Sequence, residues 1–67
     1  MNNLRFTVHS YSGYWWIHDN QTGEAARNRG GARLIYHPRQ NTWEEIRKAY
    51  GRARRKADKL NLAEVAA

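Results

Sequence analysis

The sequence predicts an α+β fold in which a small three- or four-stranded antiparallel sheet packs on one C-terminal amphipathic helix. The first half contains short segments rich in aromatic and β-branched residues, separated by glycine-containing turns. The second half contains one long run of apolar residues at spacings of three and four, which is typical of a single helix face. We expect one domain over residues 1–67, with an ordered core of about residues 4–61 and little buried volume, because the chain is short.

The first two segments predict a β-hairpin. Residues 4–9 alternate between apolar and polar side chains, as a half-buried strand does, and residues 10–13 predict a turn. Residues 14–18 predict a second strand with Trp15 and Ile17 facing the core, although the opposite orientation stays open because this strand is apolar on both sides. The outer face would then carry Arg5, Thr7, His9, Tyr14, Trp16 and His18.

The middle of the chain predicts a further turn at residues 19–23 and a last strand at residues 32–36, which ends before Pro38. Residues 24–27 predict either a third short strand or the start of a loop, and residues 28–31 are glycine-rich and flexible. Arg33 and Ile35 would join the outer face. We expect the sheet to present to the helix Leu4, Phe6, Val8, Trp15, Ile17, Leu34 and Tyr36.

The helix is predicted over residues 42–61. Thr42 and Glu45 have the spacing of a capping box, and Asn61 is a candidate C-cap. Residues 62–67 would add a helical turn or form a frayed tail. We expect Trp43 and Tyr50 to supply most of the core volume. The full apolar stripe is Trp43, Ile46, Ala49, Tyr50, Ala53, Ala57 and Leu60.

The charge balance points to an anionic partner. Twelve Lys and Arg residues against six Asp and Glu residues give a formal net charge of +6 and a pI near 10.3. Nucleic acid is the commonest polyanion for such a domain, although an acidic protein would satisfy the same electrostatics. One candidate phosphate-binding surface is a cationic band on the polar side of the helix, formed by Lys48, Arg52, Arg55, Lys56 and Lys59.

The outer face of the sheet is the second candidate surface, because basic residues interleaved with aromatic ones can stack on bases or flank phosphates. A sheet can also enter the major groove of DNA. The same face would equally serve as a homodimer interface, as a contact for a protein partner or as an ordinary surface. Its candidate groove or base contacts are Arg5, Tyr14, Trp16 and Arg33.

The residues give little support to catalysis. The chain has no cysteine, and His9, His18 and His37 follow no metal-ligand spacing, so we expect no metal site and no cofactor. No nucleophile triad, phosphate-binding glycine loop or paired carboxylates are evident. A small RNase that uses His9 and His18 as cross-strand neighbours is an alternative. Without a signal-peptide pattern or an apolar run of transmembrane length, we expect a cytoplasmic protein.

Two family resemblances bear on function. The element order and the string YWWIHDNQTGE ahead of a closing helix resemble the sheet-type DNA-binding modules of phage integrase N-termini and AP2-like domains. This resemblance covers residues 4–61 and implies that the helix packs behind a sheet that reads the major groove. The long stretch at residues 24–31 and the very basic helix depart from that pattern. The sheet contacts it implies are Arg5, Tyr14, Trp16, His18 and Arg33.

The segment GARLIYHPRQNTWEEIRKAYGRA is loosely similar to the last strand and helix of HicA-type mRNA-cleaving toxins. The N-terminal helix of that family and its Gly-Ser-His segment have no counterpart in this chain. Our leading hypothesis is therefore non-catalytic nucleic-acid binding, with DNA favoured over RNA, in an accessory protein of a phage or mobile element. The first alternative is a phage-type inhibitor or adaptor that binds an acidic host protein, and the second is a HicA-like RNase toxin. A homodimer stays open.

Overall fold

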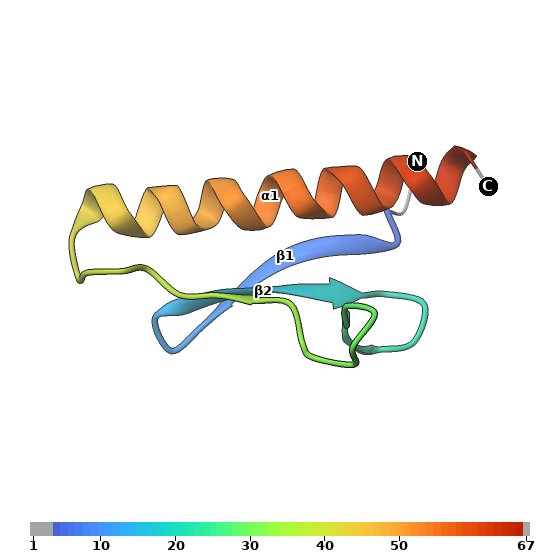
Figure 1. Cartoon of the computed structure of the whole chain (residues 1–67), viewed down its shortest axis with the longest axis horizontal. Coiled ribbons are helices and arrows are strands. Elements are labelled where there is room, and N and C mark those ends of the chain that lie inside the picture. Colours follow the sequence, from blue (N-terminus) through green and yellow to red (C-terminus); the bar gives the residue numbers. More distant parts are fainter. Residues whose placement is uncertain (1–3, 67) are drawn as a thin grey trace.

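The computed structural model describes residues 4–66 and contains a four-stranded antiparallel sheet with one helix packed on one of its faces (Figure 1). The predicted fold class and element order are thereby confirmed. Strand β2 is central, because it pairs with β1 along one edge and with β3 and β4 in succession along the other. The elements are β1 (Phe6–Tyr11), β2 (Tyr14–Asp19), β3 (Glu24–Ala25), β4 (Ile35–Tyr36) and helix α1 (Trp43–Ala66).

Strands β1 and β2 form a hairpin that is longer than the sequence predicted. The pairing runs to Tyr11 opposite Tyr14, so that only Ser12 and Gly13 remain in the loop. Both loop residues have positive φ, 49° at Ser12 and 86° at Gly13. Two-residue hairpin loops of type I′ require this backbone geometry, which also matches the twist of the strands. Residues 10 and 11 therefore extend β1 instead of belonging to the turn.

The chain between β3 and β4 leaves the sheet as a protruding hairpin, which we call the arm (residues 27–33). The residues on either side of the arm, just after β3 and just before β4, both hydrogen-bond to Ile17 of β2. The N–H of Ile17 donates to the carbonyl of Leu34 (3.2 Å), and its carbonyl accepts from the N–H of Ala26 (2.8 Å). A bridge between Arg27 and Arg33 closes the base of the arm. For residues 24–27 the sequence predicted either a short strand or the start of a loop. The structure contains the short strand β3, followed by the turn of the arm.

The core lies between the sheet and a stripe of alanines on α1. Ala49, Ala53 and Ala57 are at most 2 % exposed, and Ile17 of β2 is fully buried. Small side chains let the helix backbone approach the sheet closely, so most of the core volume comes from the strands. The partly buried residues that pack around this core are Phe6, Val8, Leu34, Tyr36 and Leu60. The predicted orientation of the second strand is confirmed, because Ile17 faces the core.

Two large residues do not take the core positions predicted for them. Trp43 is 79 % exposed, because it opens the first turn of α1, which extends past the tip of the β1–β2 hairpin (Figure 1). Leu4 is 51 % exposed and precedes β1. Tyr50 is only half-covered and meets Trp15 edge-on, with ring centroids 4.8 Å apart. The expectation that Trp43 and Tyr50 supply most of the core volume is therefore wrong.

The ends of α1 are fixed by polar contacts. At the N-terminus the N–H of Glu45 donates to Oγ1 of Thr42 (3.2 Å), which is one of the two hydrogen bonds of the predicted capping box, whereas Oε2 of Glu45 is buried without a hydrogen-bond partner in residues 4–66. The helix continues to Ala66, so Asn61 is not the C-cap. Its side-chain amide instead accepts from the N–H of Phe6 and donates to the carbonyl of Phe6, both at 2.9 Å. Asn61 thereby satisfies backbone groups on the outer edge of β1.

Arg5 lies in an ion-pair cluster and not on the outer face of the sheet, which corrects its predicted position. Its guanidinium donates twice to the buried carboxylate of Asp19 and once to Glu64, each at 3.0 Å. These hydrogen bonds lower the pKa of Asp19 below its usual range, against the opposing effect of its burial. The cluster joins the start of β1, the end of β2 and the last turns of α1.

The alanine stripe gives a packing prediction. Ala53→Leu forces a larger side chain between α1 and the sheet, and we expect the free energy of unfolding to fall by about 1–3 kcal/mol. Ala63→Leu is the matched control, because residue 63 is exposed on the same helix and should change stability by about 0.5 kcal/mol or less. Urea unfolding followed by circular dichroism measures both. Equal effects of the two substitutions would contradict the packing described here.

The Asp19 cluster gives a pH prediction. Because the folded-state pKa of Asp19 is lowered, its stabilising contribution is present above the unfolded pKa of about 3.9 and is lost as the pH falls through the lower, folded value. At pH 7, Asp19→Asn should lower the free energy of unfolding by about 1–3 kcal/mol, and this deficit should shrink below about pH 4. Asp58→Asn is the control, because Asp58 and Arg54 form an exposed pair on α1. A deficit that stays constant down to low pH would contradict the prediction.

Candidate nucleic-acid interface

The helix covers one face of the sheet, and in the described part of the chain no element packs on the other. Because side chains alternate along a strand, β1 and β2 place every second residue on this outer face. The register sets Thr7 opposite His18, His9 opposite Trp16 and Tyr11 opposite Tyr14.

Three of these residues form a ring cluster. The indole of Trp16 packs against the imidazoles of both His9 and His18, with ring centroids 5.1 Å and 5.2 Å away. The two imidazoles are themselves 5.1 Å apart. Nε2 of His9 lies 2.9 Å from Oγ1 of Thr7, whereas Nδ1 of His18 is buried and has no hydrogen-bond partner among residues 4–66. The indole is therefore held in place by its neighbours, and one polar atom under the face is left unsatisfied.

A second aromatic group lies near the tip of the hairpin. Tyr14 meets Tyr11 edge-on with centroids 6.1 Å apart, and it meets His37 at 5.1 Å. Together with the ring cluster it forms what we call the aromatic face, which runs across β1, β2 and the segment after β4. Its members are His9, Tyr11, Tyr14, Trp16, His18 and His37.

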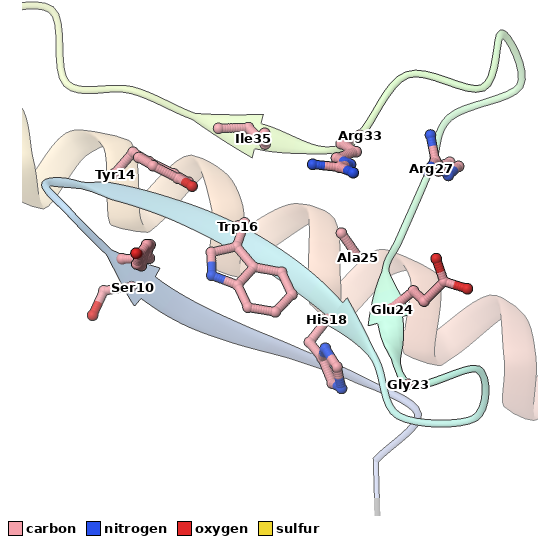
Figure 2. A pocket seen from close by; sticks show the side chains of 11 residues that line it. Ser10, Tyr14, Trp16, His18, Gly23, Glu24, Ala25, Arg27, Arg33 and Ile35 are labelled. Atoms are coloured by element: carbon pink, nitrogen blue, oxygen red, sulfur yellow. The ribbon is translucent and has the colours of Figure 1, made fainter.

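Two arginines border this face. A hollow of about 490 Å³ lies over β2, and its lining includes Trp16, His18, Ile35, Arg27 and Arg33 (Figure 2). The two arginines stand opposite each other at the base of the arm, and like charges at opposite strand positions destabilise a sheet. Neither forms an ion pair within the described residues, although Arg27 donates to the carbonyl of Gly31 (2.8 Å). The arm thus holds two cations beside the aromatic face, at some cost in stability.

The cationic band on α1 is partly engaged in contacts within the protein. Nζ of Lys48 lies 3.6 Å from Glu44 and 3.9 Å from Glu45, and Arg52 donates to the carbonyl of His37 (3.2 Å). In residues 4–66 the other predicted phosphate contacts form no ion pair. They are Arg55, Lys56 and Lys59.

A second hollow, of about 660 Å³, lies on α1 beside this band. It is lined by the exposed Trp43, by Arg47, by Gly51 and by Arg55. The guanidinium of Arg55 passes close to Gly51, where an added Cβ would lie 3.5 Å from its nitrogen. Because Gly51 has no side chain, it does not fill this hollow. The helix thus has an aromatic and cationic surface on the side of the protein away from the aromatic face.

Only part of the predicted sheet site comes together. Tyr14, Trp16 and Arg33 all line the first hollow, whereas Arg5 is held by Asp19 and Glu64. From the sequence, Arg27 was only a weak candidate, in a glycine-rich loop of residues 27–33 whose arginines could bind nucleic acid or that could simply be a hairpin connection, and Tyr11 and His37 were missed as members of this surface. The symmetric placement of two arginines around the Asn-Arg-Gly-Gly-Ala turn was a signal for Arg27, because a hairpin over that turn sets them opposite each other.

The three histidines do not lie together. His9 and His18 are diagonal neighbours in the ring cluster, and His37 lies apart from them against Tyr14. Within the described residues no group of three or more histidines and acids is placed to hold a metal ion. The one helix of residues 4–66 is too polar to cross a membrane.

Comparison with models of protein families, with curated protein sequences and with solved structures finds no match to this chain. Its function must therefore be inferred from the composition and geometry of its own surfaces. The aromatic face with its two arginines and the basic surface of α1 are the two candidates.

Proposed function

We propose that this protein is a non-catalytic nucleic-acid-binding module and that the aromatic face makes the main contacts. The observation that carries the proposal is an uncovered sheet face on which Trp16 packs with two histidines and is bordered by two arginines that form no ion pair within residues 4–66. Rings and cations of this kind are the groups that stack on bases and neutralise phosphates. A purely structural role does not account for them, because the core lies on the opposite side of the sheet.

The distribution of acidic residues supports this choice. Asp19 and Glu64 are paired with Arg5, Glu44 and Glu45 with Lys48, and Asp58 with Arg54. Among the six acids of the chain, only Glu24 lines the hollow beside the aromatic face. The face therefore carries little negative charge that would repel a phosphate backbone.

We assign the cationic band on α1 a supporting role. A charged, solvated helix face is ordinary in small proteins, and several of its members already have partners. Its charges still add to the net +6, which attracts any polyanion at long range and speeds its encounter. The band thus contributes to the rate of association, and the aromatic face contributes the contacts that hold the ligand.

One observation favours a second function, which is binding of an acidic protein as an inhibitor or adaptor. Trp43 is 79 % exposed beside Arg47 and Arg55, and tryptophan and arginine dominate the energetics of protein interfaces. This function predicts a discrete protein complex that Trp43→Ala abolishes. Catalysis gains no comparable support, because in residues 4–66 neither His9 nor His18 hydrogen-bonds to a carboxylate that would orient it as a base.

Salt-dependent binding tests the proposed surface. In titrations of a labelled oligonucleotide at several salt concentrations, Arg27→Ala with Arg33→Ala should weaken binding. The same double variant should reduce the slope of log K against log[salt] by about 1.4–1.8. The matched control is Arg55→Ala with Lys59→Ala, which removes the same charge from α1 and should change the slope less. A larger effect of the helix variant would assign the site to the cationic band, and salt-independent weak binding by every variant would exclude the proposed function.

A further inference from the structure

We infer that the aromatic face recognises unpaired nucleobases, so that the ligand is a single-stranded or locally opened nucleic acid and not an intact duplex. This inference rests on the proposed function and specifies the class of ligand that the same face takes. It departs from what the resemblance to integrase-type modules implies, which is reading of the major groove. Three features of the face support it.

The first feature is the orientation of the rings. Figure 2 shows the indole of Trp16 lying flat along β2 and nearly face-on toward the open side of the hollow. In a duplex the flat faces of the bases are covered by their neighbours, and only base edges are displayed in the grooves. A ring presented by its flat side has no stacking partner in an intact duplex. It does have one in an unstacked base, which every single strand supplies.

The second feature is preorganisation at a spacing that suits an opened strand. His9 and His18 both pack against the indole, at 5.1 Å and 5.2 Å, so binding orders little that is not already ordered. Tyr14 lies two residues along the same strand, which is about 6.6–6.8 Å. This is a Cα spacing along the sheet, and it exceeds the rise of about 3.4 Å between stacked bases. We therefore expect bases that meet both side chains to be splayed apart, as single-stranded segments allow.

The third feature is what the face lacks. Reading base edges in a groove depends on long polar side chains, such as asparagine, glutamine or arginine, directed at the bases. Among the described residues, the middle of the outer face carries Thr7, His9, Trp16 and His18 instead. The arginines lie at the rim, in the arm, where an anion would offset the unfavourable placement of two like charges at opposite strand positions. This division suits a strand whose bases lie on the rings and whose phosphates pass Arg27 and Arg33.

The test compares nucleic-acid forms and two matched tryptophan variants. Labelled single-stranded DNA, single-stranded RNA of the same sequence and the corresponding DNA duplex are titrated against the full chain at one salt concentration. We expect tighter binding to single strands than to the duplex. Trp16→Leu should weaken single-strand binding by about 5- to 150-fold, as loss of one base–aromatic stack does. Trp43→Leu makes the same change at the exposed tryptophan of α1 and should leave single-strand binding unchanged.

A second measurement does not depend on the folding of the Trp16 variant. In a Trp43→Phe protein, emission from the two remaining tryptophans should be quenched by single-stranded oligonucleotide and not by duplex, because stacking on a base quenches an indole. Quenching by DNA, by RNA or by both supports the inference and shows which sugar is accepted. Duplex binding as tight as single-strand binding, with no quenching, would overturn the inference while leaving the proposed function in place. Absence of binding to all three forms would overturn the proposed function as well.

Discussion

The close packing of a single helix against one face of the sheet is the constraint on which the rest of this structure depends. Ala49, Ala53 and Ala57 let α1 lie directly on Ile17 and its neighbours, which gives a sealed but thin core. Residues 4–66 contain no second helix to cover the opposite face. One side of the sheet is therefore committed to stability, and the other is exposed to solvent. Every aromatic residue on that second side has to be explained by something other than the core.

Because the core is thin, polar contacts also hold the sheet and the helix together. They lie at the end of the domain where β1 begins and β2 ends. The side chain of Asn61 hydrogen-bonds to both the N–H and the carbonyl of Phe6. Arg5 forms ion pairs with Asp19 of β2 and with Glu64 of α1. Both devices tie the last turns of the helix to the first strand, which are far apart in sequence. They also explain why α1 extends past residue 61, since a shorter helix would not bring Glu64 to Arg5.

Periodicity made most of the fold predictable. Alternation along residues 4–9 and the aromatic segment at residues 14–18 predicted the hairpin, and the capping spacing predicted the start of the helix. The orientation of Trp15 and Ile17 was favoured but left open, because the second strand is apolar on both sides. The errors have a common cause. Periodicity shows on which face of a helix or strand a residue lies, but not how far the neighbouring element extends to cover that residue. Trp43 lies on the correct stripe but beyond the end of the sheet, and Arg5 lies next to the strand but turns toward a buried carboxylate. The candidate site was predicted for Tyr14, Trp16 and Arg33, whereas Arg27 depended on a hairpin that local sequence did not settle.

We assign the cationic band and the aromatic face different roles in binding. The band on α1 is solvated and partly neutralised by Glu44 and Glu45, so its effect is mainly a long-range field that salt screens. The rings of the aromatic face are held in fixed contact, so their stacking acts only at short range and depends weakly on salt, whereas the phosphate contacts proposed for Arg27 and Arg33 at its border depend on salt. A ligand attracted by the first surface would be retained by the second only if it can present the flat side of a base. Selectivity between nucleic-acid forms would then come from the uncovered sheet and not from the net charge of the chain.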